Sequence, residues 1–454
     1  MDIKGKKVLV FGSGISGEGA CRLLLGKGAD VVLYDGNKKL CEDEIRSKIV
    51  EDKEEETRFQ IVLGAFPEEM MEELALVIMS PGVPTDLPIV ETMREKEIPV
   101  WGEIELAYVF GKGDVLAITG TNGKTTTTAL LGQIMQDYNE HTYVVGNIGN
   151  PYTSVAADTT DDTVIVAEIS SFQLETIHTF HPKVSAVLNI TPDHLNRHHT
   201  MEAYIETKER IAENQTKEDI CVLNYEDDVL REFGEKTHAE VLYFSSARKL
   251  EKGIYLDGTK IIYAADEPIE LCDVSELKIL GTHNHENVMA AAAMAYAYGV
   301  PAEVIRKNLL TFPGVEHRIE FVAEKNGVAY YNDSKGTNPD AAIKGIQAMN
   351  RPTVLIGGGY DKDSEYDEWI RSFDGKVRKL VLLGATREKI AQCARKNGFD
   401  DIIMADTFEE AFEQCVKYAE AGDAVLLSPA CASWGMFKNY EERGDKFKEL
   451  VDQL

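Results

Sequence analysis

Residues 115–130, VLAITGTNGKTTTTAL, carry side chains that are suited to binding a phosphate group. A short apolar run breaks at Gly120 and Gly123 and is followed by Lys124, Thr125 and further threonines. Glycines let backbone N–H groups approach an anion, and the helix that follows points its positive end at the same charge. Lys124 would reach the terminal phosphates, and the Thr125 hydroxyl would bind a magnesium ion. The pattern favours ATP or GTP binding over a strand-to-helix turn that merely contains Gly-Lys-Thr.

A carboxylate downstream strengthens the magnesium interpretation. Glu168 ends the apolar run in TVIVAEISSFQLE, and an acid at a strand end in the same sheet can complete a magnesium shell. An isolated acid at such a position can also be simply solvated. Only two residues separate Gly120 from Gly123, fewer than in the common phosphate-loop pattern, so the match to that pattern is imperfect.

A second glycine-rich turn, GSGISG at residues 12–17, follows the apolar run KVLVF. With Asp35 after the next apolar run, it matches a dinucleotide-binding fingerprint and suggests an NAD-dependent dehydrogenase. Against this alternative, a new phosphate-loop segment begins near residue 112, before a full dinucleotide-binding sheet could be completed.

Residues 189–211, NITPDHLNRHHTMEAYIETKERI, hold three histidines and Lys208. His194 and His198 have the i, i+4 spacing of a zinc-binding pair, but neither a supporting cysteine nor an H-E-x-x-H motif accompanies them. Lys208 lies in a charged helical pattern, where an exposed lysine is the ordinary interpretation.

The elements around these residues alternate between short apolar strands and polar helices, which is typical of parallel sheets covered on both faces. We therefore expect an α/β protein with three doubly wound, mostly parallel sheets: a Rossmann-like domain over 1–111, a P-loop ATPase-like domain over 112–312 and a Rossmann-like domain over 313–454. The segment GIYLDGTKIIYAA predicts a hairpin, and residues 286–298 predict an alanine-rich helix. In such sheets, ligands collect at the carboxyl ends of the strands.

Composition limits the partners and the compartment. The net charge of −29 argues against nucleic acid and anionic membranes, which require a basic surface. We expect no membrane insertion, because neither a long apolar run nor a secretory amino end is present. Seven scattered cysteines without a C-x-x-C pair fit a reducing cytoplasm.

Eight motifs occur in one order along the chain: TGTNGKTT, AEISSFQLE, NITPDHLNRH, YIETKERI, GTHNHENVMAA, PGVEHRIE, NDSKGTN and SPACASWGMF. Together they resemble the Mur ligase family, the ATP-dependent enzymes that form amide bonds in peptidoglycan precursor synthesis. NDSKGTN and LSPACASWGMF are similar to the branch that adds D-glutamate to UDP-N-acetylmuramoyl-L-alanine, rather than to those adding L-alanine, a diamino acid or a dipeptide.

The resemblance implies that the L-alanine carboxylate attacks the γ-phosphate of ATP and that the amine of D-glutamate then displaces phosphate from the acyl phosphate. The protein's task is mainly positioning and charge neutralisation. The first glycine loop would hold the UDP of the substrate, and we expect a monomer. Another amino-acid-adding Mur ligase remains open, as does a GTPase-like switch, which would leave NDSKGTN without a role.

The resemblance also implies a nucleotide site with two magnesium ions. The nucleotide would contact Thr121, Asn122, Gly123, Lys124, Thr125, Thr126, Thr127, Asn284, Asn287, Arg318 and Asp333. Thr125 and Glu168 would hold one magnesium ion, and His194 would hold the second together with a Lys208 carbamylated by carbon dioxide. A carbamate presents two oxygens to a cation, but its formation requires a depressed pKa at Lys208. The asparagines could instead cap a helix, and Arg318 could form an interdomain salt bridge.

Three further groups follow from the resemblance. Catalytic residues would be Lys124, Glu168, His194, Lys208, Arg318 and Lys335. The UDP-sugar-peptide substrate would contact Gly14, Ile15, Ser16, Asp35, Ser80, Gly82, Asn147, Ser170, Gln173 and His194. D-glutamate would contact Lys335, Thr337, Lys362, Ser428 and Phe437, and lysines suit a substrate with two carboxylates.

Overall fold

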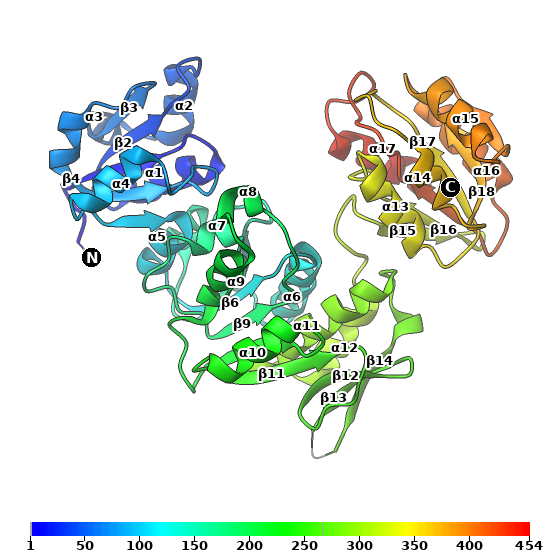
Figure 1. Ribbon diagram of the computed structural model, residues 1–454, viewed down its shortest axis with the longest axis horizontal. Helices are drawn as coiled ribbons and strands as arrows, with labels where there is room; N and C mark the ends of the chain where they lie inside the picture. Colours follow the sequence, from blue (N-terminus) through cyan, green and yellow to red (C-terminus); the bar gives the residue numbers. More distant parts are fainter. Residues whose placement is uncertain (1, 266) are drawn as a thin grey trace. The chain divides into compact units, whose positions relative to one another are not determined.

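The computed structural model describes residues 2–265 and 267–454. Within them, the strands form sheets of five, nine and six strands that are connected by helices (Figure 1). Most neighbouring strands run parallel. The predicted fold class, α/β with three mostly parallel sheets, is confirmed.

The five-stranded sheet has the order β3-β2-β1-β4-β5, and its strands run parallel. Successive residues of β1 alternate between two apolar clusters, with Val8 and Val10 in one and Leu9 and Phe11 in the other. Both faces are therefore buried, which explains the continuous apolar run. The elements are β1 Lys7–Phe11, α1 Ile15–Gly26, β2 Asp30–Asp35, α2 Glu42–Ile49, α3 Lys53–Arg58, β3 Phe59–Leu63, η1 Glu68–Glu73, β4 Leu74–Met79, α4 Pro88–Glu95, β5 Val100–Gly102 and α5 Glu103–Phe110.

The nine-stranded sheet has the order β14-β13-β12-β11-β10-β9-β6-β8-β7. Strands β12 and β13 pair antiparallel, which confirms the predicted hairpin. The strands are β6 Asp114–Thr119, β7 Thr142–Gly146, β8 Val164–Glu168, β9 Val184–Val187, β10 Ile220–Asn224, β11 Glu240–Ser245, β12 Gly253–Asp257, β13 Lys260–Ala264 and β14 Ile269–Asp273. The helices are α6 Lys124–Tyr138, η2 Tyr152–Ser154, η3 Ala156–Asp158, α7 Ser171–Leu174, α8 Leu195–His198, α9 Met201–Glu209, η4 Arg210–Ala212, α10 Asp228–Lys236, η5 Val274–Glu276, α11 Thr282–Tyr298 and α12 Ala302–Thr311.

The six-stranded sheet has the order β15-β16-β20-β17-β18-β19, and only β15 pairs antiparallel among its described strand pairs. Its strands also separate two apolar clusters, since Leu355 lies in one and Val354 in the other. The elements are β15 Glu320–Lys325, β16 Val328–Asn332, α13 Pro339–Ala348, β17 Thr353–Gly357, α14 Asp367–Arg371, β18 Val377–Leu382, α15 Arg387–Lys396, β19 Ile402–Met404, α16 Phe408–Tyr418, β20 Ala424–Leu427 and α17 Tyr440–Asp452.

The chain divides into two compact units. The first extends to Leu271 and includes Glu286–Arg306, whereas the second comprises Cys272–His285 and Lys307–Leu454. The first unit thus contains the five-stranded sheet and nearly all of the nine-stranded sheet. The predicted domain boundaries after residues 111 and 312 stay a prediction.

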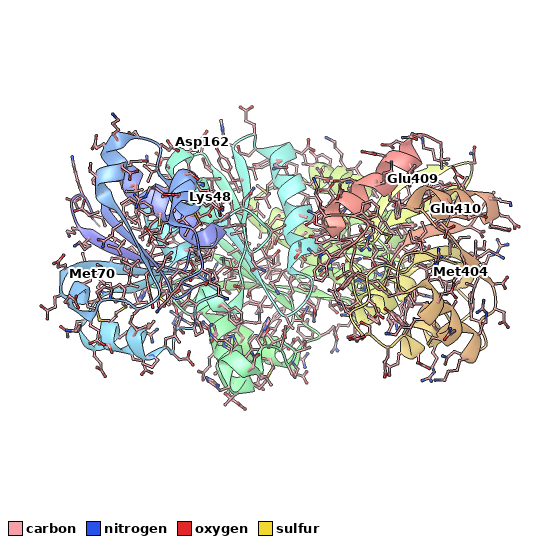
Figure 2. All side chains as sticks on the ribbon, turned by 90° about the horizontal axis from the view of Figure 1, so that it is seen from above. Lys48, Met70, Asp162, Met404, Glu409 and Glu410 are labelled. Carbon is pink, nitrogen blue, oxygen red and sulfur yellow. The ribbon has the colours of Figure 1, made fainter. Side chains whose placement is uncertain are left out.

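Asp162 and Glu409, which are labelled in Figure 2, are exposed charged side chains. The seven cysteines are free thiols. Among the described helices, none combines the length and the apolar character needed to cross a bilayer.

Candidate active site

Three neighbouring strands of the nine-stranded sheet end in polar segments at one edge. Strand β6 leads into residues 120–123, β8 ends at Glu168, and β9 leads into residues 188–194. These strands are adjacent in the order β9-β6-β8 and run parallel, so their carboxyl ends lie side by side. The sheet therefore brings together three sequence segments that were each predicted to bind nucleotide or metal.

The phosphate loop is held in shape by the neighbouring segments. The Thr121 backbone N–H donates to the Asn189 carbonyl at 2.9 Å, and the Asn122 N–H donates to Asn189 Oδ1 at 2.8 Å. Gly123 precedes α6 with a φ of 87°, and a Cβ there would lie 2.2 Å from Asn287 Oδ1. The same Asn287 oxygen accepts from Thr127 Oγ1 at 3.4 Å. Asn287 thus supports the loop, and only glycine fits at residue 123.

Two lysines converge on one carbonyl of this loop. Lys124 Nζ donates to the Gly120 carbonyl at 2.8 Å and to the Thr121 carbonyl at 2.9 Å. Lys208 Nζ donates to the same Gly120 carbonyl, also at 2.8 Å. Lys208 is 1% exposed, so the alternative of an exposed lysine is wrong. Burial and the positive charge of Lys124 lower the pKa of Lys208 to about 7.

Tyr204 contacts Lys208 and Thr121, and the sequence did not predict this role. Its ring centroid lies 4.8 Å from Lys208 Nζ, and its hydroxyl lies 3.1 Å from Thr121 Oγ1. Burial raises the pKa of the Tyr204 hydroxyl. Tyr204 stands one helical turn before Lys208 in α9, and this i, i+4 spacing is the signal that could have identified it.

Glu168 has an arrangement that suits a metal ligand. It is 1% exposed, so the alternative of a merely solvated acid is wrong. Its Oε1 accepts from Asn147 Nδ2 at 2.8 Å, whereas its buried Oε2 has no hydrogen-bond partner among the described residues. A buried carboxylate oxygen without a partner is costly unless a cation or donor completes it. Thr125, the other ligand predicted for this ion, lies in the first turn of α6.

His194 and His198 have different surroundings despite their spacing. His194 is exposed and has a φ of 51°, and its ring lies 5.0 Å from the ring of Phe172. His198 is buried, and its Nε2 lies 2.9 Å from Ser171 Oγ. The described contacts of His198 are therefore those of a packed core histidine, which argues against the zinc alternative.

Ser170 and Gln173 form a reciprocal cap at the start of α7. Gln173 Oε1 accepts from the Ser170 N–H and from Ser170 Oγ, both at 2.9 Å. Ser170 Oγ in turn accepts from the Gln173 N–H at 3.3 Å. The two side chains predicted to contact the sugar-peptide portion thus position each other directly after β8.

The first glycine loop follows β1 and is fastened by Asp35. Ser13 Oγ donates to Asp35 Oδ2 at 2.6 Å, and the Ser13 N–H donates to the same oxygen at 3.1 Å. Burial acts to raise the pKa of Asp35, but hydrogen bonds from Ser13 and Asn37 outweigh it and lower that pKa. Ser80, after β4, donates to the Gly12 carbonyl at 3.2 Å. Gly14, Ile15 and Gly82 of the predicted uridine site are exposed, and Ser16 is half-buried.

In the second unit, Asp333 and Ser428 follow the adjacent strands β16 and β20. Ser428 Oγ donates to Asp333 Oδ2 at 2.6 Å. Burial raises the pKa of Asp333 to about 7, and the Ser428 hydrogen bond only partly offsets this effect. The loop continues through Lys335, whose N–H donates to the His317 carbonyl at 2.9 Å, to Thr337, whose N–H donates to the Lys335 carbonyl at 2.8 Å.

Arg443 supports this loop through hydrogen bonds to Ser334, and the sequence did not predict this role. It is 1% exposed, and its Nε and Nη2 donate to the Ser334 hydroxyl and carbonyl at 2.9 and 2.8 Å. Burial lowers the pKa of its guanidinium to about 10. The EERG sequence gives no local sign that this arginine is buried, because its partners lie far away in the chain.

The other predicted residues of the second unit are more dispersed. Lys362 is exposed with its Nζ 4.7 Å from the centroid of the Trp434 ring, and Phe437 packs against Phe408 with centroids 5.2 Å apart. Arg318 is exposed. Asn284 donates from Nδ2 to the Leu280 carbonyl at 2.7 Å.

Three family models match the chain. The Mur ligase MurD-like N-terminal domain matches residues 6–102, the Mur ligase middle domain matches residues 118–295, and the Mur ligase glutamate ligase domain matches residues 317–431.

Curated relatives match over their whole length. A UDP-N-acetylmuramoylalanine–D-glutamate ligase of Lachnospira eligens is 57% identical over 455 residues, covering 100% of both chains. Proteins with the same name from Thermoanaerobacter sp. and Clostridioides difficile are 50% and 46% identical, and these alignments also cover 100% of both chains.

Solved structures share the fold. The UDP-N-acetylmuramate-alanine ligase MurC of Thermotoga maritima aligns with a TM-score of 0.57 and 18% identity, covering 99% of each chain. The MurF ligase of the same organism, in complex with ADP, aligns with a TM-score of 0.55 and 17% identity, covering 100% of this chain and 96% of that one.

Proposed function

Since the chain belongs to the Mur ligase family, we propose that it uses ATP to add D-glutamate to UDP-N-acetylmuramoyl-L-alanine. The observation that carries the proposal is the 57% identity, over the full length of both chains, to a relative named for this reaction. The motifs NDSKGTN and SPACASWGMF also resemble the D-glutamate-adding branch more than the branches that add other amino acids.

The reaction proceeds in two displacements. An oxygen of the L-alanine carboxylate attacks the γ-phosphorus of ATP, and ADP leaves. The amine of D-glutamate then attacks the acyl carbon, inorganic phosphate leaves, and the nitrogen loses a proton as the amide forms. Phosphorylation replaces an oxide leaving group with phosphate, so the protein must supply alignment and positive charge.

The phosphate loop has the shape and the charge to hold the ATP phosphates. The loop ends at Gly123, where the first N–H groups of α6 are available to an anion, and the Lys124 ammonium lies against the Gly120 and Thr121 carbonyls of the loop. Lys124 can exchange its two carbonyl contacts for phosphate oxygens by rotation of its side chain. In this arrangement Lys124 neutralises charge that builds up on the transferred phosphoryl group.

The donor sets fit two magnesium ions. Glu168 Oε2, which has no hydrogen-bond partner in the described part of the chain, and the Thr125 hydroxyl would offer hard oxygen ligands to one ion. A carbamylated Lys208 and His194 would offer the second set. Magnesium bound by these residues would neutralise negative charge on the phosphate groups. A pKa of about 7 leaves Lys208 a substantial neutral fraction at neutral pH, as carbamylation requires.

In this proposal the second unit binds the incoming amino acid. The proposed D-glutamate site consists of Lys335, Thr337, Lys362, Ser428 and Phe437, and the family resemblance assigns Asp333 and Arg318 to nucleotide binding. Asn284 and Asn287 complete the proposed adenine contacts. The protein would act as a monomer in the cytoplasm.

A phosphate-release assay tests the proposal directly. Purified protein, ATP, magnesium and the UDP-sugar-peptide are mixed with D-glutamate, L-glutamate, glycine or a diamino acid, and NADH absorbance is recorded in parallel. The expected result is phosphate release that depends on D-glutamate. Release with a diamino acid would assign another branch of the family, and an NADH signal would revive the dehydrogenase.

A further inference from the structure

Two large aromatic side chains are exposed in segments of the second unit that also carry residues of the proposed D-glutamate site. The exposed fractions of Tyr360 and Trp434 are 45% and 52%. Tyr360 lies in the segment that follows β17, and Trp434 lies in the segment that follows β20. Apolar surface is costly to leave in water, and neighbouring exposed apolar side chains are a sign of an interaction site. These two rings therefore require an explanation that packing does not give.

The two segments are held together at one edge of the six-stranded sheet. Strands β17 and β20 are adjacent and parallel, so the segments after them leave the same edge of the sheet, where ligands collect. The Tyr360 N–H donates to the Ala432 carbonyl at 2.9 Å. Gly359 allows this close approach, because a Cβ there would lie only 2.4 Å from the Ala432 oxygen. The backbone thus places residues 360 and 434 close together.

Lys362 holds a positive charge against this aromatic pair. Its Nζ lies 4.7 Å from the centroid of the Trp434 ring, within the range of a cation–π contact. The Trp434 ring meets the Tyr360 ring in a T-shaped arrangement with centroids 5.6 Å apart. Among the described residues, the Lys362 side chain has neither an ion pair nor a hydrogen bond, and the neighbouring Asp361 pairs with Lys389 instead. The Lys362 ammonium is therefore oriented but not neutralised.

We propose that Trp434, supported by Tyr360, is a positioning residue that holds the Lys362 ammonium in place for one carboxylate of the incoming amino acid. The inference rests on the proposed function and deepens it at the amino-acid site. A lysine side chain is long and flexible, so holding its end against an indole face lowers the entropy that is lost when it binds a carboxylate. The ring also excludes water from one side of the ammonium, and the exposed side remains accessible to an anion.

Trp434→Leu tests the ring directly. Leucine keeps apolar bulk but has no aromatic face, so Lys362 loses its cation–π contact. We expect KM for D-glutamate to rise about twofold to fivefold, as for a contact of this kind at an exposed site, and KM for ATP and for the UDP-sugar-peptide to stay parental. The melting temperature should not change, because Trp434 is half exposed. An unchanged KM for D-glutamate, or an equal rise in all three KM values, would overturn the proposal.

Trp434→Phe separates the aromatic face from apolar bulk. Phenylalanine keeps a weaker aromatic face, so KM for D-glutamate should fall between the values of the parent and of Trp434→Leu. A phenylalanine variant that behaves like the leucine variant would refute the cation–π contact. If Trp434→Leu does not fold, Tyr360→Leu takes its place, since it removes the supporting ring and should raise the same KM by a smaller factor; a parental KM would then refute the proposal.

Tyr418→Leu is the matched control. Tyr418 is an aromatic side chain of the same unit that is 38% exposed, and the Nζ of Lys379 lies 4.8 Å from its ring centroid. This lysine already pairs with Asp401 at 3.2 Å, so its charge is neutralised within the protein. We expect all three KM values to stay parental. If Tyr418→Leu raised KM for D-glutamate as much as Trp434→Leu does, both changes would reflect a general disturbance of the unit, and the proposal would be wrong.

A double mutant assigns the effect to Lys362. Because Trp434 acts through Lys362, Trp434→Leu should add nothing to the change in KM for D-glutamate that Lys362→Met causes by itself. Additive changes would mean that the ring acts independently of the lysine, which contradicts the positioning role.

The parent protein, assayed in parallel, distinguishes the two possible failures. A parent that releases no phosphate with D-glutamate overturns the proposed function and the inference with it. An active parent whose KM for D-glutamate is matched by Trp434→Leu overturns the inference alone.

Discussion

The two glycine-rich loops share one local plan, but they are surrounded by opposite charges. Residues 12–17 and residues 120–123 each connect a buried parallel strand to a helix. The first loop is fastened by the carboxylate of Asp35, whereas the second carries two lysines on the Gly120 carbonyl. At the first loop the carboxylate accepts hydrogen bonds from the loop itself and so fixes the shape of the loop. At the second loop the lysines supply positive charge that can neutralise a reacting phosphoryl group.

Removing Lys124 should have the largest effect, because it takes away positive charge that distinguishes the second loop from the first. Without its ammonium, Lys124→Ala leaves the phosphoryl charge unmatched, and we expect turnover to fall by about a hundredfold to a thousandfold. Phosphate release at saturating substrates measures this effect. Lys112→Ala, at an exposed lysine paired with Asp161, is the control and should keep parental turnover. Near-parental turnover of Lys124→Ala would refute the mechanism.

Lys208→Ala should be the next most damaging change, and it can be repaired chemically. The methyl side chain leaves a space in which a small carboxylate can stand in for the carbamate oxygens. We expect activity to fall by about a hundredfold and to recover in part when acetate or formate is added. Titration of these acids against phosphate release measures the recovery. An impaired variant that no short carboxylic acid rescues would count against the carbamate.

The pH dependence of Lys208 supplies a second test at the same residue. Its pKa is about 7 in the folded protein but 10.5 ordinarily, so the unfolded chain holds a proton that the folded chain releases between these values. The free energy of unfolding therefore increases as pH rises from about 7 to about 10 in carbon-dioxide-free buffer. Thermal melting of the parent should show this rise, and Lys208→Met should lack it. Parallel curves for the two proteins would contradict the lowered pKa.

Gly123→Ala should damage nucleotide binding selectively. The φ of 87° strains any side chain, and the added Cβ would approach Asn287 Oδ1, so we expect a loss of about 2 kcal/mol in ATP affinity. Equilibrium binding of ATP and of the UDP substrate measures the selectivity. Gly258→Ala has a φ of 63° but open space around the new Cβ, in a distant hairpin, and should leave ATP binding unchanged. If Gly123→Ala bound neither ATP nor the UDP substrate, the variant would be generally unfolded and the selective effect would be refuted.

Ser13→Ala should have the smallest effect, and it tests whether the first loop binds the UDP substrate rather than ATP. It removes the hydroxyl donor to Asp35 but keeps the backbone donor, so we expect KM for the UDP substrate to rise severalfold, equivalent to about 1 kcal/mol. KM for ATP should not change. Ser47→Ala, on an exposed face of α2, provides the control. A change in KM for ATP instead would mean that the two loops do not have separate ligands.

The sequence was sufficient for the alternation of apolar strands with helices and for the two glycine-rich loops. The apolar runs predicted the parallel strands, and GIYLDGTKIIYAA predicted the antiparallel hairpin, because both patterns are local. The burial of Lys208 was not predictable from its charged helix, since the carbonyl it contacts is 88 residues away in the chain. The burial of Arg443 was not predictable for the same reason, because its partner Ser334 is 109 residues away in the chain. Tertiary packing, rather than neighbouring residues, supplies the partners of both side chains.

The hairpin of β12 and β13 has a practical consequence. It is separated from β9 by β10 and β11, and the segments of the phosphate site follow β6, β8 and β9. Its turn between Asp257 and Lys260 is exposed, and exposed loop tips tolerate insertions. An affinity tag or a fluorophore can therefore be placed in this turn to immobilise or follow the protein while both of its termini remain untouched.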